Sequence, residues 1–282
     1  ATVASGVLPA AATNWNSVVR VIGDVTVPSG ATLNIAPGTH VLIDGTSNAG
    51  SSSGSDIIVQ SGGVINALGT LASPISITSS EVNTRWGEIN TGGATTLWQY
   101  WVVSRACHSP GGGHTGTGPA FRLGNGANFT VEDSVISDLP GKTLINSGNT
   151  TITFRRTHLA RCVMGPEIDG SAVTVEDCNL SEMLPAYRET GSQDDEDCIY
   201  IHDSGGRPVI LRHSVLANCQ DDALDCLAGD LTVEDCIIRN AFDKGVSLLN
   251  NNILIRRTMI IDNDIGISSK CQLGSDAEPF FN

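Results

Sequence analysis

Hydrophobic and polar positions alternate in short runs along most of this chain, and this pattern predicts β-strands. The runs are rich in Val, Ile, Leu and Thr and are separated by Asn, Asp, Gly and Pro. Near the N-terminus the alternating apolar pairs are Val25/Val27, Leu33/Ile35 and Val41/Ile43. The i, i+3, i+4 spacing of an amphipathic helix does not appear in these repeating segments. The pattern therefore favours an all-β chain.

One short strand pattern, an apolar pair followed by two charged residues and a small residue, recurs along the second half of the chain. Its copies are TVEDS (130–134), TFRRT (153–157), TVEDC (174–178), ILRHS (210–214), TVEDC (232–236) and LIRRT (254–258). Successive copies are 23, 21, 36, 22 and 22 residues apart, and the longest interval is one coil plus about 14 residues, 184–197. A repeat of this length built from short strands predicts a β-solenoid with coils of about 22 residues.

Within this repeat the charges alternate in sign from one coil to the next. One column is Glu132, Arg155, Glu176, Arg212, Glu234 and Arg256, and the next is Asp133, Arg156, Asp177, His213, Asp235 and Arg257. Strands in a sheet lie about 4.8 Å apart, and opposite charges facing each other contribute roughly 0.2 to 1 kcal/mol per pair. We interpret the alternation as a structural device that sets the stacking register, with a binding role for the stripe as the alternative.

The solenoid organises the chain as one domain, residues 1–282, because each coil buries its apolar residues against the next. We expect irregular N-terminal coils over 20–105, a Gly-rich loop over 106–126, and regular coils over 127–270 with an insertion at 184–197. The aromatic residues Trp86, Trp98, Tyr100 and Trp101 are expected to pack between strands, with a sugar-stacking platform as the alternative.

The eight cysteines contain no pair of CxxC motifs, so a zinc ribbon is not expected. By the repeat register, Cys178 and Cys236 share a column of small residues, and Cys162 and Cys219 share a column with Leu139, Met183 and Ala241. These four are predicted to be buried thiols. The remaining four, Cys107, Cys198, Cys226 and Cys271, are freer to pair, and the sequence does not select their connectivity.

The chain is acidic, with a net charge of −14 and a pI near 4.6. This charge argues against nucleic acid or an anionic membrane as a partner. No run of 18 apolar residues exists, so no membrane-spanning segment is expected. The small polar start ATVASG is expected of a mature or trimmed N-terminus. These features suit a secreted, extracellular or cell-surface protein that handles cations.

Acidic residues concentrate between Asp194 and Leu248, where 12 Asp and Glu face three Arg and one Lys. A period of 22 places Asp222 over Lys244, and the preceding coil places Asp197 over Asp222. Two carboxylates about 5 Å apart repel by roughly 3 kcal/mol at an effective dielectric constant of 20. A Ca²⁺ ion, which takes six to eight oxygen ligands, would offset this repulsion, and Asp194, Asp195 and Glu196 lie near enough to contribute. The alternative is that Lys244 and solvent suffice.

The segment gDVTVpsGaTLnIaPGt (23–39), the W-G-x-I motif at 86–89 and the 22-residue coils resemble the secreted right-handed parallel β-helix proteins of the pectate-lyase-like superfamily. The resemblance implies an all-β, right-handed, single-stranded parallel β-helix. Locally, Asp197, Asp221, Asp222 and Asp225 are spaced like the calcium ligands of polysaccharide lyase family nine. That family also uses a Lys base on a neighbouring coil; its spacing does not fall on a lysine here, and Lys244 is the nearest substitute.

Two hypotheses about function follow. The first is an extracellular calcium-binding β-helix protein that binds or cleaves acidic polysaccharide by β-elimination. Such a lyase needs a cation beside the uronate carboxylate and a base near the working pH, for which Lys244 is the candidate. A Lys244 that only pairs with Asp222 is the structural alternative. The second hypothesis is a non-catalytic extracellular structural or surface module, able to associate end to end through uncovered coils.

Overall fold

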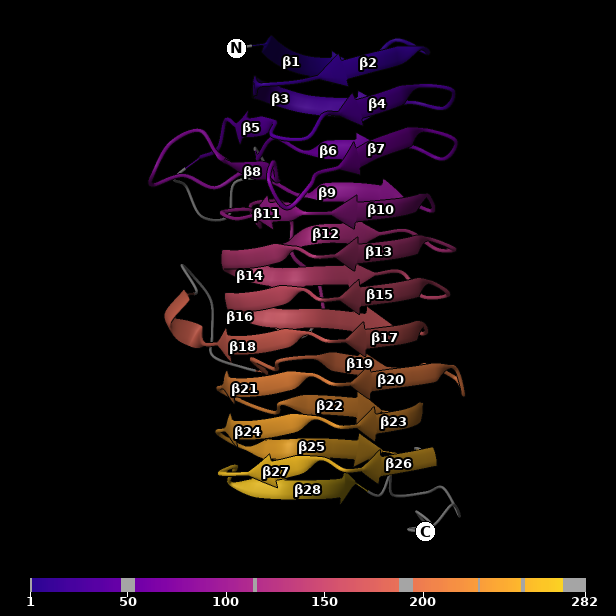
Figure 1. Cartoon of the computed structure of the whole chain (residues 1–282), viewed down its shortest axis with the longest axis vertical. Coiled ribbons are helices and arrows are strands. Elements are labelled where there is room, and N and C mark those ends of the chain that lie inside the picture. The colour runs from indigo at the N-terminus through magenta and orange to yellow at the C-terminus, as the bar shows by residue number, and fades with distance from the viewer. Residues whose placement is uncertain are drawn as a thin grey trace.

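The computed structural model describes residues 2–46, 54–113, 116–187, 195–227, 229–249 and 252–270. The chain is a right-handed parallel β-helix in which successive coils stack along one axis, from β1 at one end to β28 at the other (Figure 1). Every strand pairing between coils is parallel. The predicted fold class is therefore confirmed.

The strands form a ten-stranded sheet and a wider 18-stranded sheet. The ten-stranded sheet consists of β2 (Ala12–Trp15), β4 (Thr32–Ile35), β7 (Val64–Leu68), β10 (Thr95–Gln99), β13 (Asn128–Glu132), β15 (Thr151–Arg155), β17 (Ala172–Glu176), β20 (Pro208–Arg212), β23 (Asp230–Glu234) and β26 (Asn252–Arg256). In each coil one strand of this sheet is followed by strands of the wider sheet.

The 18-stranded sheet consists of β1 (Thr2–Val7), β3 (Val18–Val27), β5 (His40–Ile43), β6 (Ile57–Val59), β8 (Ile75–Ser79), β9 (Ile89–Gly92), β11 (Trp101–Val103), β12 (Pro119–Leu123), β14 (Val135–Asn146), β16 (His158–Asp169), β18 (Asn179–Met183), β19 (Tyr200–His202), β21 (Val215–Cys219), β22 (Leu224–Leu227), β24 (Ile237–Ala241), β25 (Lys244–Leu249), β27 (Met259–Ile261) and β28 (Ile265–Lys270). It bends into two faces. Face 1 contains β18, β21 and β24, face 2 contains β19, β22 and β25, and the long strand β16 pairs with both β18 and β19.

The core lies inside the coils and is filled by alternate residues of each strand. The predicted apolar pairs of the N-terminal coils are all at most 3% exposed. Trp86, Trp98 and Trp101 are at most 1% exposed, and the rings of Trp98 and Trp101 meet edge to face at 4.9 Å. These tryptophans therefore pack in the core, as the favoured interpretation predicted.

The alternating charges stack as predicted. Strand pairing places Glu132 beside Arg155, Arg155 beside Glu176, and so on through Arg212, Glu234 and Arg256. Arg155 lies 2.7 Å from the Glu132 carboxylate and 2.9 Å from that of Glu176. The stripe is thus a ladder of ion pairs on the outside of the ten-stranded sheet.

The second charge column forms a corner of the helix. Each of its residues has a positive φ, between 48° and 54°, a conformation that L-residues other than Gly, Asn and Asp seldom adopt. Arg156 binds both oxygens of Asp133 at 2.6 and 3.0 Å, and Arg257 binds both oxygens of Asp235 at 2.7 and 2.8 Å. Paired forks of this kind are strong charge-assisted hydrogen bonds and help hold the corner in this conformation.

The cysteine columns also agree with the predicted register. Leu139, Cys162, Met183, Cys219 and Ala241 stack in one column of face 1. All seven cysteines in the described part of the chain are buried, including Cys107, Cys198 and Cys226, and Cys271 lies outside that part. Burial raises the pKa of the Cys178 thiol to about 11, as expected of a structural thiol.

Two predicted irregular segments differ from expectation in detail. Strand β12 lies inside the stretch 106–126 that was assigned to a loop, because Ala120, Phe121 and Leu123 pack into the core. The insertion begins with the short 3-10 helix η1 (Pro185–Tyr187), which projects from the stack of coils (Figure 1). Its residues 188–194, including Asp194, lie outside the described residues. Within the described ranges no helix has the length and apolar character needed to cross a membrane.

Replacing Glu176 by Arg is expected to destabilise the protein by about 1 to 2 kcal/mol. The change removes the ion pair with Arg155 at 2.9 Å and the looser one with Arg212 at 4.0 Å, and it places three cations in one column. Ordinary surface changes stay within roughly 0.5 kcal/mol. Thermal unfolding at low salt measures the effect, and an unchanged melting temperature would refute a stabilising role for the ladder.

Candidate functional site

The predicted acidic residues meet where two successive coils enter face 2. Asp197 precedes β19, Asp221 and Asp222 precede β22, and Asp225 lies within β22. Because Tyr200 pairs with Asp225, Asp197 stacks on Asp222 as the repeat register predicted. We call these four aspartates the acidic cluster. One oxygen each of Asp197, Asp221 and Asp222 lies within 4.8 Å of the others.

Coil stacking holds the carboxylates of the acidic cluster in place. The backbone N–H of Asp222 donates to Oδ1 of Asp197 at 2.9 Å, and the N–H of Lys244 donates to Oδ1 of Asp222 at 3.0 Å. Asp197 and Asp222 are each only 2% exposed. The carboxylates of Asp197 and Asp222 thus each accept a hydrogen bond from the start of the next coil, and both are removed from water.

Burial and mutual repulsion make the negative charge of this site costly. Burial raises the pKa of Asp197 well above its usual range, and the charges of Asp221, Asp222 and Asp225 raise it further. Burial, together with the charge of Asp222, raises the pKa of Asp221 to about 7. The pKa of Asp222 is raised by burial, although Lys244 opposes the shift. A group of carboxylates with raised pKa values favours either protons or a bound cation.

Asp225 stands apart from the other three. Its Oδ2 lies 3.4 Å from Nζ of Lys270, and its Oδ1 is buried with no hydrogen-bond partner among the described residues. Ser247, its neighbour on the next coil, also has a buried hydroxyl with no partner in the described part of the chain. Buried polar groups without partners are uncommon and call for an explanation. The structure therefore brings three of the predicted ligands, Asp197, Asp221 and Asp222, together. The fourth, Asp225, lies further along β22 and pairs with Lys270.

Lys244 pairs with Asp222 of the acidic cluster. Its Nζ lies 3.2 Å from Oδ1 of Asp222 and also contacts the carboxylate of Asp243. Burial lowers the pKa of Lys244, but the hydrogen bond that Lys244 donates to Asp243 and the charge of Asp222 raise it more, so that the pKa lies above its ordinary value. In the arrangement described here Lys244 is a protonated ion-pair partner.

Sequence reasoning missed two residues beside the acidic cluster. Lys270, at the end of β28, reaches Asp225 although Leu227 and Leu249 occupy its column on the preceding coils. Tyr200 is 4% exposed and lies between Glu167 and Asp225 on adjacent strands. A search that followed every outward column of face 2, and allowed for the reach of long side chains, would have found both.

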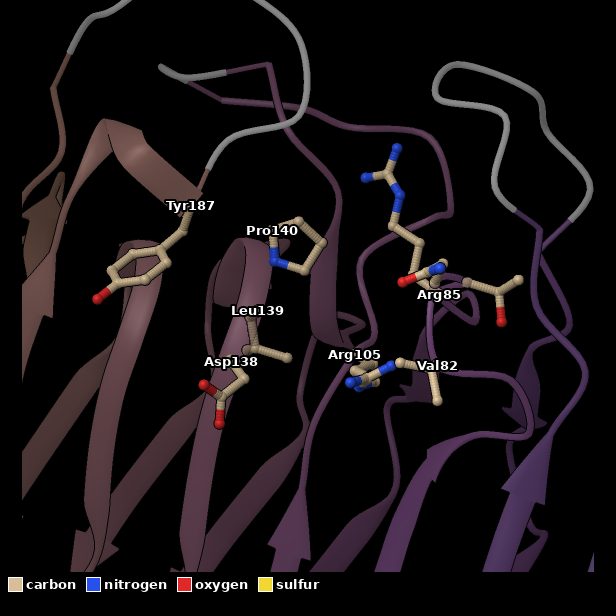
Figure 2. A pocket seen from close by; sticks show the side chains of 9 residues that line it. Val82, Arg85, Arg105, Asp138, Leu139, Pro140 and Tyr187 are labelled. Carbon is tan, nitrogen blue, oxygen red and sulfur yellow. The ribbon is translucent and has the colours of Figure 1, made fainter.

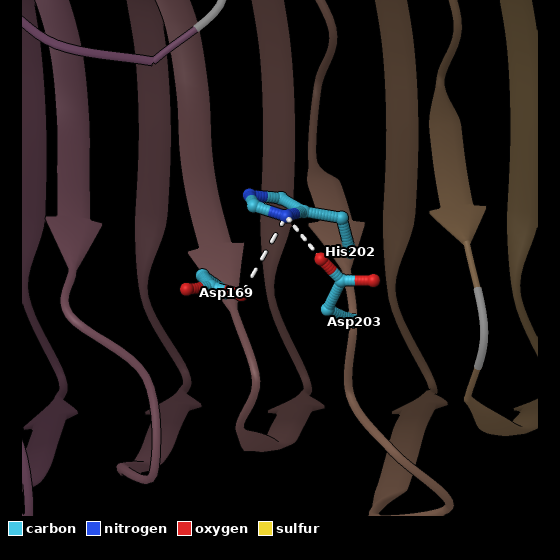
Figure 3. A group of neighbouring side chains, drawn as sticks. All are labelled: Asp169, His202 and Asp203. Carbon is cyan, nitrogen blue, oxygen red and sulfur yellow. Dashed lines mark ion pairs between the residues drawn. The ribbon is translucent and has the colours of Figure 1, made fainter.

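A second group of potential metal ligands lies at the other end of β19. Figure 3 shows His202 between two aspartates, with its Nδ1 3.6 Å from Asp169 and 3.7 Å from Asp203. The ring of His202 stacks on that of Tyr200, with centroids 5.0 Å apart. The side chain of Asp203 is 83% exposed. This group is far more open to water than the acidic cluster.

The Gly-rich loop crosses face 2 and is held there by polar contacts. The Nη2 group of Arg122 donates to the carbonyl of Pro110 at 2.6 Å, and the hydroxyl of Ser109 donates to Oδ1 of Asp56 at 2.5 Å. Lys142, buried beneath the loop, donates to the carbonyl of Gly112 and pairs with Glu167. The loop therefore covers the part of face 2 that adjoins the acidic cluster.

Replacing Asp56 by Asn is expected to stabilise the protein above pH 6 by about 1 to 2 kcal/mol. Burial raises the pKa of Asp56 from 3.8 to about 6, despite the hydrogen bonds from Ser109 and Glu88. Because the folded-state pKa lies above the unfolded value, the carboxyl favours folding below pH 4 and loses that contribution as the pH rises through 6. Asn keeps the acceptor oxygen without the charge.

Unfolding measured from pH 4 to pH 8 tests this expectation. The variant should lose part of the wild-type decline in stability over that window, and the two proteins should converge toward pH 4. An Asp56→Asn protein that is less stable than wild type at pH 8 would show that Asp56 is ionised without penalty.

Comparison with known proteins finds distant structural similarity and no matching family. No family model matches the chain, and no curated protein matches it. Among solved structures it is similar to crystal structures of the periplasmic alginate epimerase AlgG. A double mutant matches at 11% identity with a TM-score of 0.38, and a single mutant matches at 9% with a TM-score of 0.31. Each match covers 93% of this chain and 66% of the epimerase chain.

Proposed function

We propose that the acidic cluster binds Ca²⁺ and that the protein binds, and acts as a lyase on, an acidic polysaccharide at this site. The observation that carries the proposal is the convergence of Asp197, Asp221 and Asp222 within 4.8 Å, with two of the three carboxylates nearly excluded from water. A lone lysine ion pair does not balance three carboxylates. A divalent cation balances them without requiring protonation.

The donor set suits Ca²⁺. Oxygens bound to one Ca²⁺ at about 2.3 to 2.6 Å lie at most about 5 Å apart, and the three aspartates meet this limit. All donors are carboxylate oxygens, which a hard cation prefers. The partnerless Oδ1 of Asp225 is a fourth donor within the same patch of face 2. Asp195, which influences the pKa of Asp221, is a further neighbour.

For β-elimination, the residues of this chain have to bind a uronate and accept its proton. The cation held by the acidic cluster supplies neutralisation of the substrate carboxylate, which acidifies the adjacent C–H. Lys244 is positioned to accept that proton once the charge of Asp222 is taken up by the cation, because the raised pKa of Lys244 depends in part on Asp222. The electron pair of the C–H bond forms a C=C bond, and the glycosidic C–O bond on the next carbon breaks. The departing oxygen keeps the electron pair of the broken bond and takes a proton from water.

Metal analysis and titration test the proposed binding site. The purified protein is expected to carry calcium, and after chelation to bind it again in a calorimetric titration. The second arm follows absorbance from unsaturated uronide during incubation with pectate or alginate. Absence of calcium binding at millimolar concentration would refute both the metal site and the lyase.

A non-catalytic calcium-binding extracellular module is the second candidate. The raised pKa of Lys244 favours it, since a lysine held by both Asp222 and Asp243 is a poor base. Under this candidate calcium stabilises the stacked coils and no product forms. End-to-end association through the exposed apolar residues of the last described coil, such as Met259 at 54%, remains a prediction for sizing experiments.

A further inference from the structure

The corner between face 1 and face 2, which we call the second corner, contains one residue with positive φ per coil. These residues are Arg105, Asp138, Arg161, Glu182, Asn218, Asn240 and Asp262, with φ between 53° and 60°. Strand pairing on either side stacks them in one row. Asp221 and Asp222 of the acidic cluster come shortly after Asn218 in the chain. The row of residues with positive φ and the acidic cluster therefore lie along one edge of the β-helix.

A pocket of about 370 Å³ opens on this edge, toward the N-terminal end from the acidic cluster. Figure 2 shows Arg85, Arg105 and Val82 on one side of the pocket and Tyr187, Pro140, Leu139 and Asp138 on the other. Its walls come from the loop 82–85, the first two coils of the second corner, and η1. The size lies at the lower end of the roughly 300 to 1,000 Å³ typical of ligand pockets.

The pocket carries positive charge in a protein whose net charge is −14. Arg105 forms no ion pair with any described residue, and its hydrogen bond to the carbonyl of Glu81 is long, at 3.5 Å. Asp138, the one carboxylate among the described residues of the lining, is already bound by two donors of Arg161, at 2.7 and 2.9 Å, and by the hydroxyl of Ser137. The guanidinium of Arg105 thus retains donors for an incoming anion.

Arg85 adds a second guanidinium that the fold holds in place. Its side chain is largely buried, its Nη1 is 3.5 Å from the carbonyl of Cys107, and its backbone forms an antiparallel bridge with Thr46. The backbone N–H of Arg105 donates to the carbonyl of Asp138 at 3.2 Å. Burial therefore holds the side chain of Arg85, and coil stacking holds the backbone of Arg105. A guanidinium group that is already held in place binds a carboxylate with little loss of entropy.

The rest of the lining combines apolar and aromatic side chains with the polar residues Asn83 and Thr84. Pro140 lies across the pocket from the two arginines, and Tyr187, which also lines the pocket, lies beyond Pro140 (Figure 2). A surface of this kind packs against the C–H face of a sugar ring, while the phenol hydroxyl can bond to its hydroxyl groups. Two guanidinium groups opposite an aromatic wall suit a sugar that bears a carboxylate.

We propose that this pocket is a remote subsite for a uronate residue of the acidic polysaccharide that occupies the acidic cluster. The inference rests on the proposed function and extends it. The corner rows of Arg105 and Asn218 are four coil steps apart, which is about 19 Å at the strand spacing of a sheet. A polysaccharide that runs along this edge therefore places one sugar in the pocket beside Arg105. Another sugar, several units along the same polysaccharide, lies at the cation site.

Calorimetric binding of acidic oligosaccharides in the presence of Ca²⁺ tests the subsite. Arg105→Gln is expected to weaken binding of a hexauronate about tenfold, which is about 1.4 kcal/mol, and to leave binding of a diuronate unchanged. A disaccharide is too short to reach from the acidic cluster to the pocket. Tyr187→Ala is expected to weaken hexauronate binding about threefold to tenfold, and it serves as the second variant if Arg105→Gln unfolds.

Arg257→Gln is the matched control, because Arg257 is also an arginine with positive φ but belongs to the other charged corner. It should leave both affinities unchanged. If Arg105→Gln and Tyr187→Ala bind hexauronate as wild type does, while Asp222→Asn loses it, the subsite is refuted and the proposed function stands. If the wild type binds no uronate oligomer, both are refuted. Equal losses in Arg105→Gln and Arg257→Gln would also refute the subsite, since net charge alone would explain them.

Discussion

Calcium is expected to raise the melting temperature of the metal-free protein by about 5 to 10 °C when present at a hundredfold excess over its Kd. A ligand that binds only the folded state adds about 2.7 kcal/mol at that concentration, and about 2 to 4 °C accompanies each kcal/mol in a chain of this size class. The physical origin is the repulsion among Asp197, Asp221 and Asp222, which the cation relieves.

Asp222→Asn is expected to remove most of this response. Asp222 is central, because it accepts hydrogen bonds from Lys244 and also donates its own N–H to Asp197. Asp264→Asn, at an exposed aspartate two coils from Asp222, is the control and should keep the full response. A calcium-induced shift of equal size in wild type and Asp222→Asn would place the ion elsewhere.

Lys244→Ala is expected to lower product formation from pectate or alginate by 10² to 10⁴-fold, the usual contribution of a general base. Calcium affinity should survive and even increase, because removal of Lys244 takes away a cation that competes for Asp222. Absorbance of the unsaturated product measures the first effect, and calorimetry measures the second. The two readouts separate a lost base from a lost metal site.

Lys270→Ala is the comparison that assigns the base. Lys270 approaches the acidic cluster from the other side, through Asp225 at 3.4 Å, and its side chain is 41% exposed. Retained activity in this variant supports Lys244 as the base. The reverse result, with activity lost in Lys270→Ala and kept in Lys244→Ala, would move the base to Lys270. No product from the wild-type protein on either substrate would favour the non-catalytic module.

The repeat allowed much of the fold to be predicted from the sequence. Because strands of adjacent coils pair in register at one period, residues such as Glu132, Arg155 and Glu176 had to be neighbours once the period was known. The same reasoning placed Asp197 over Asp222 and Asp222 over Lys244. In a solenoid, contacts between coils follow from sequence offset, so a single period predicts many of them.

The repeat pattern did not predict the backbone conformation at the corners. Asp, Arg and His at positions such as Asp133, Arg156 and His213 have positive φ, although only Asp is among the residues that tolerate it well. Their charges suggested exposed strand positions. Only the closed turn between the ten-stranded sheet and face 1 imposes this backbone geometry, and the ion pairs across coils offset its cost.

Sequence alone determined the architecture, the register of the charge ladder and the stacking of Asp197 on Asp222, because all of these depend on the repeat of about 22 residues. The tertiary structure decided the contacts that do not follow from this period. It set Asp225 apart from the other aspartates, brought Lys270 to it, and joined Arg85, Arg105 and Tyr187 around one pocket. These residues come from loops and strand ends whose lengths differ between coils, so their meeting depends on how the chain turns in space.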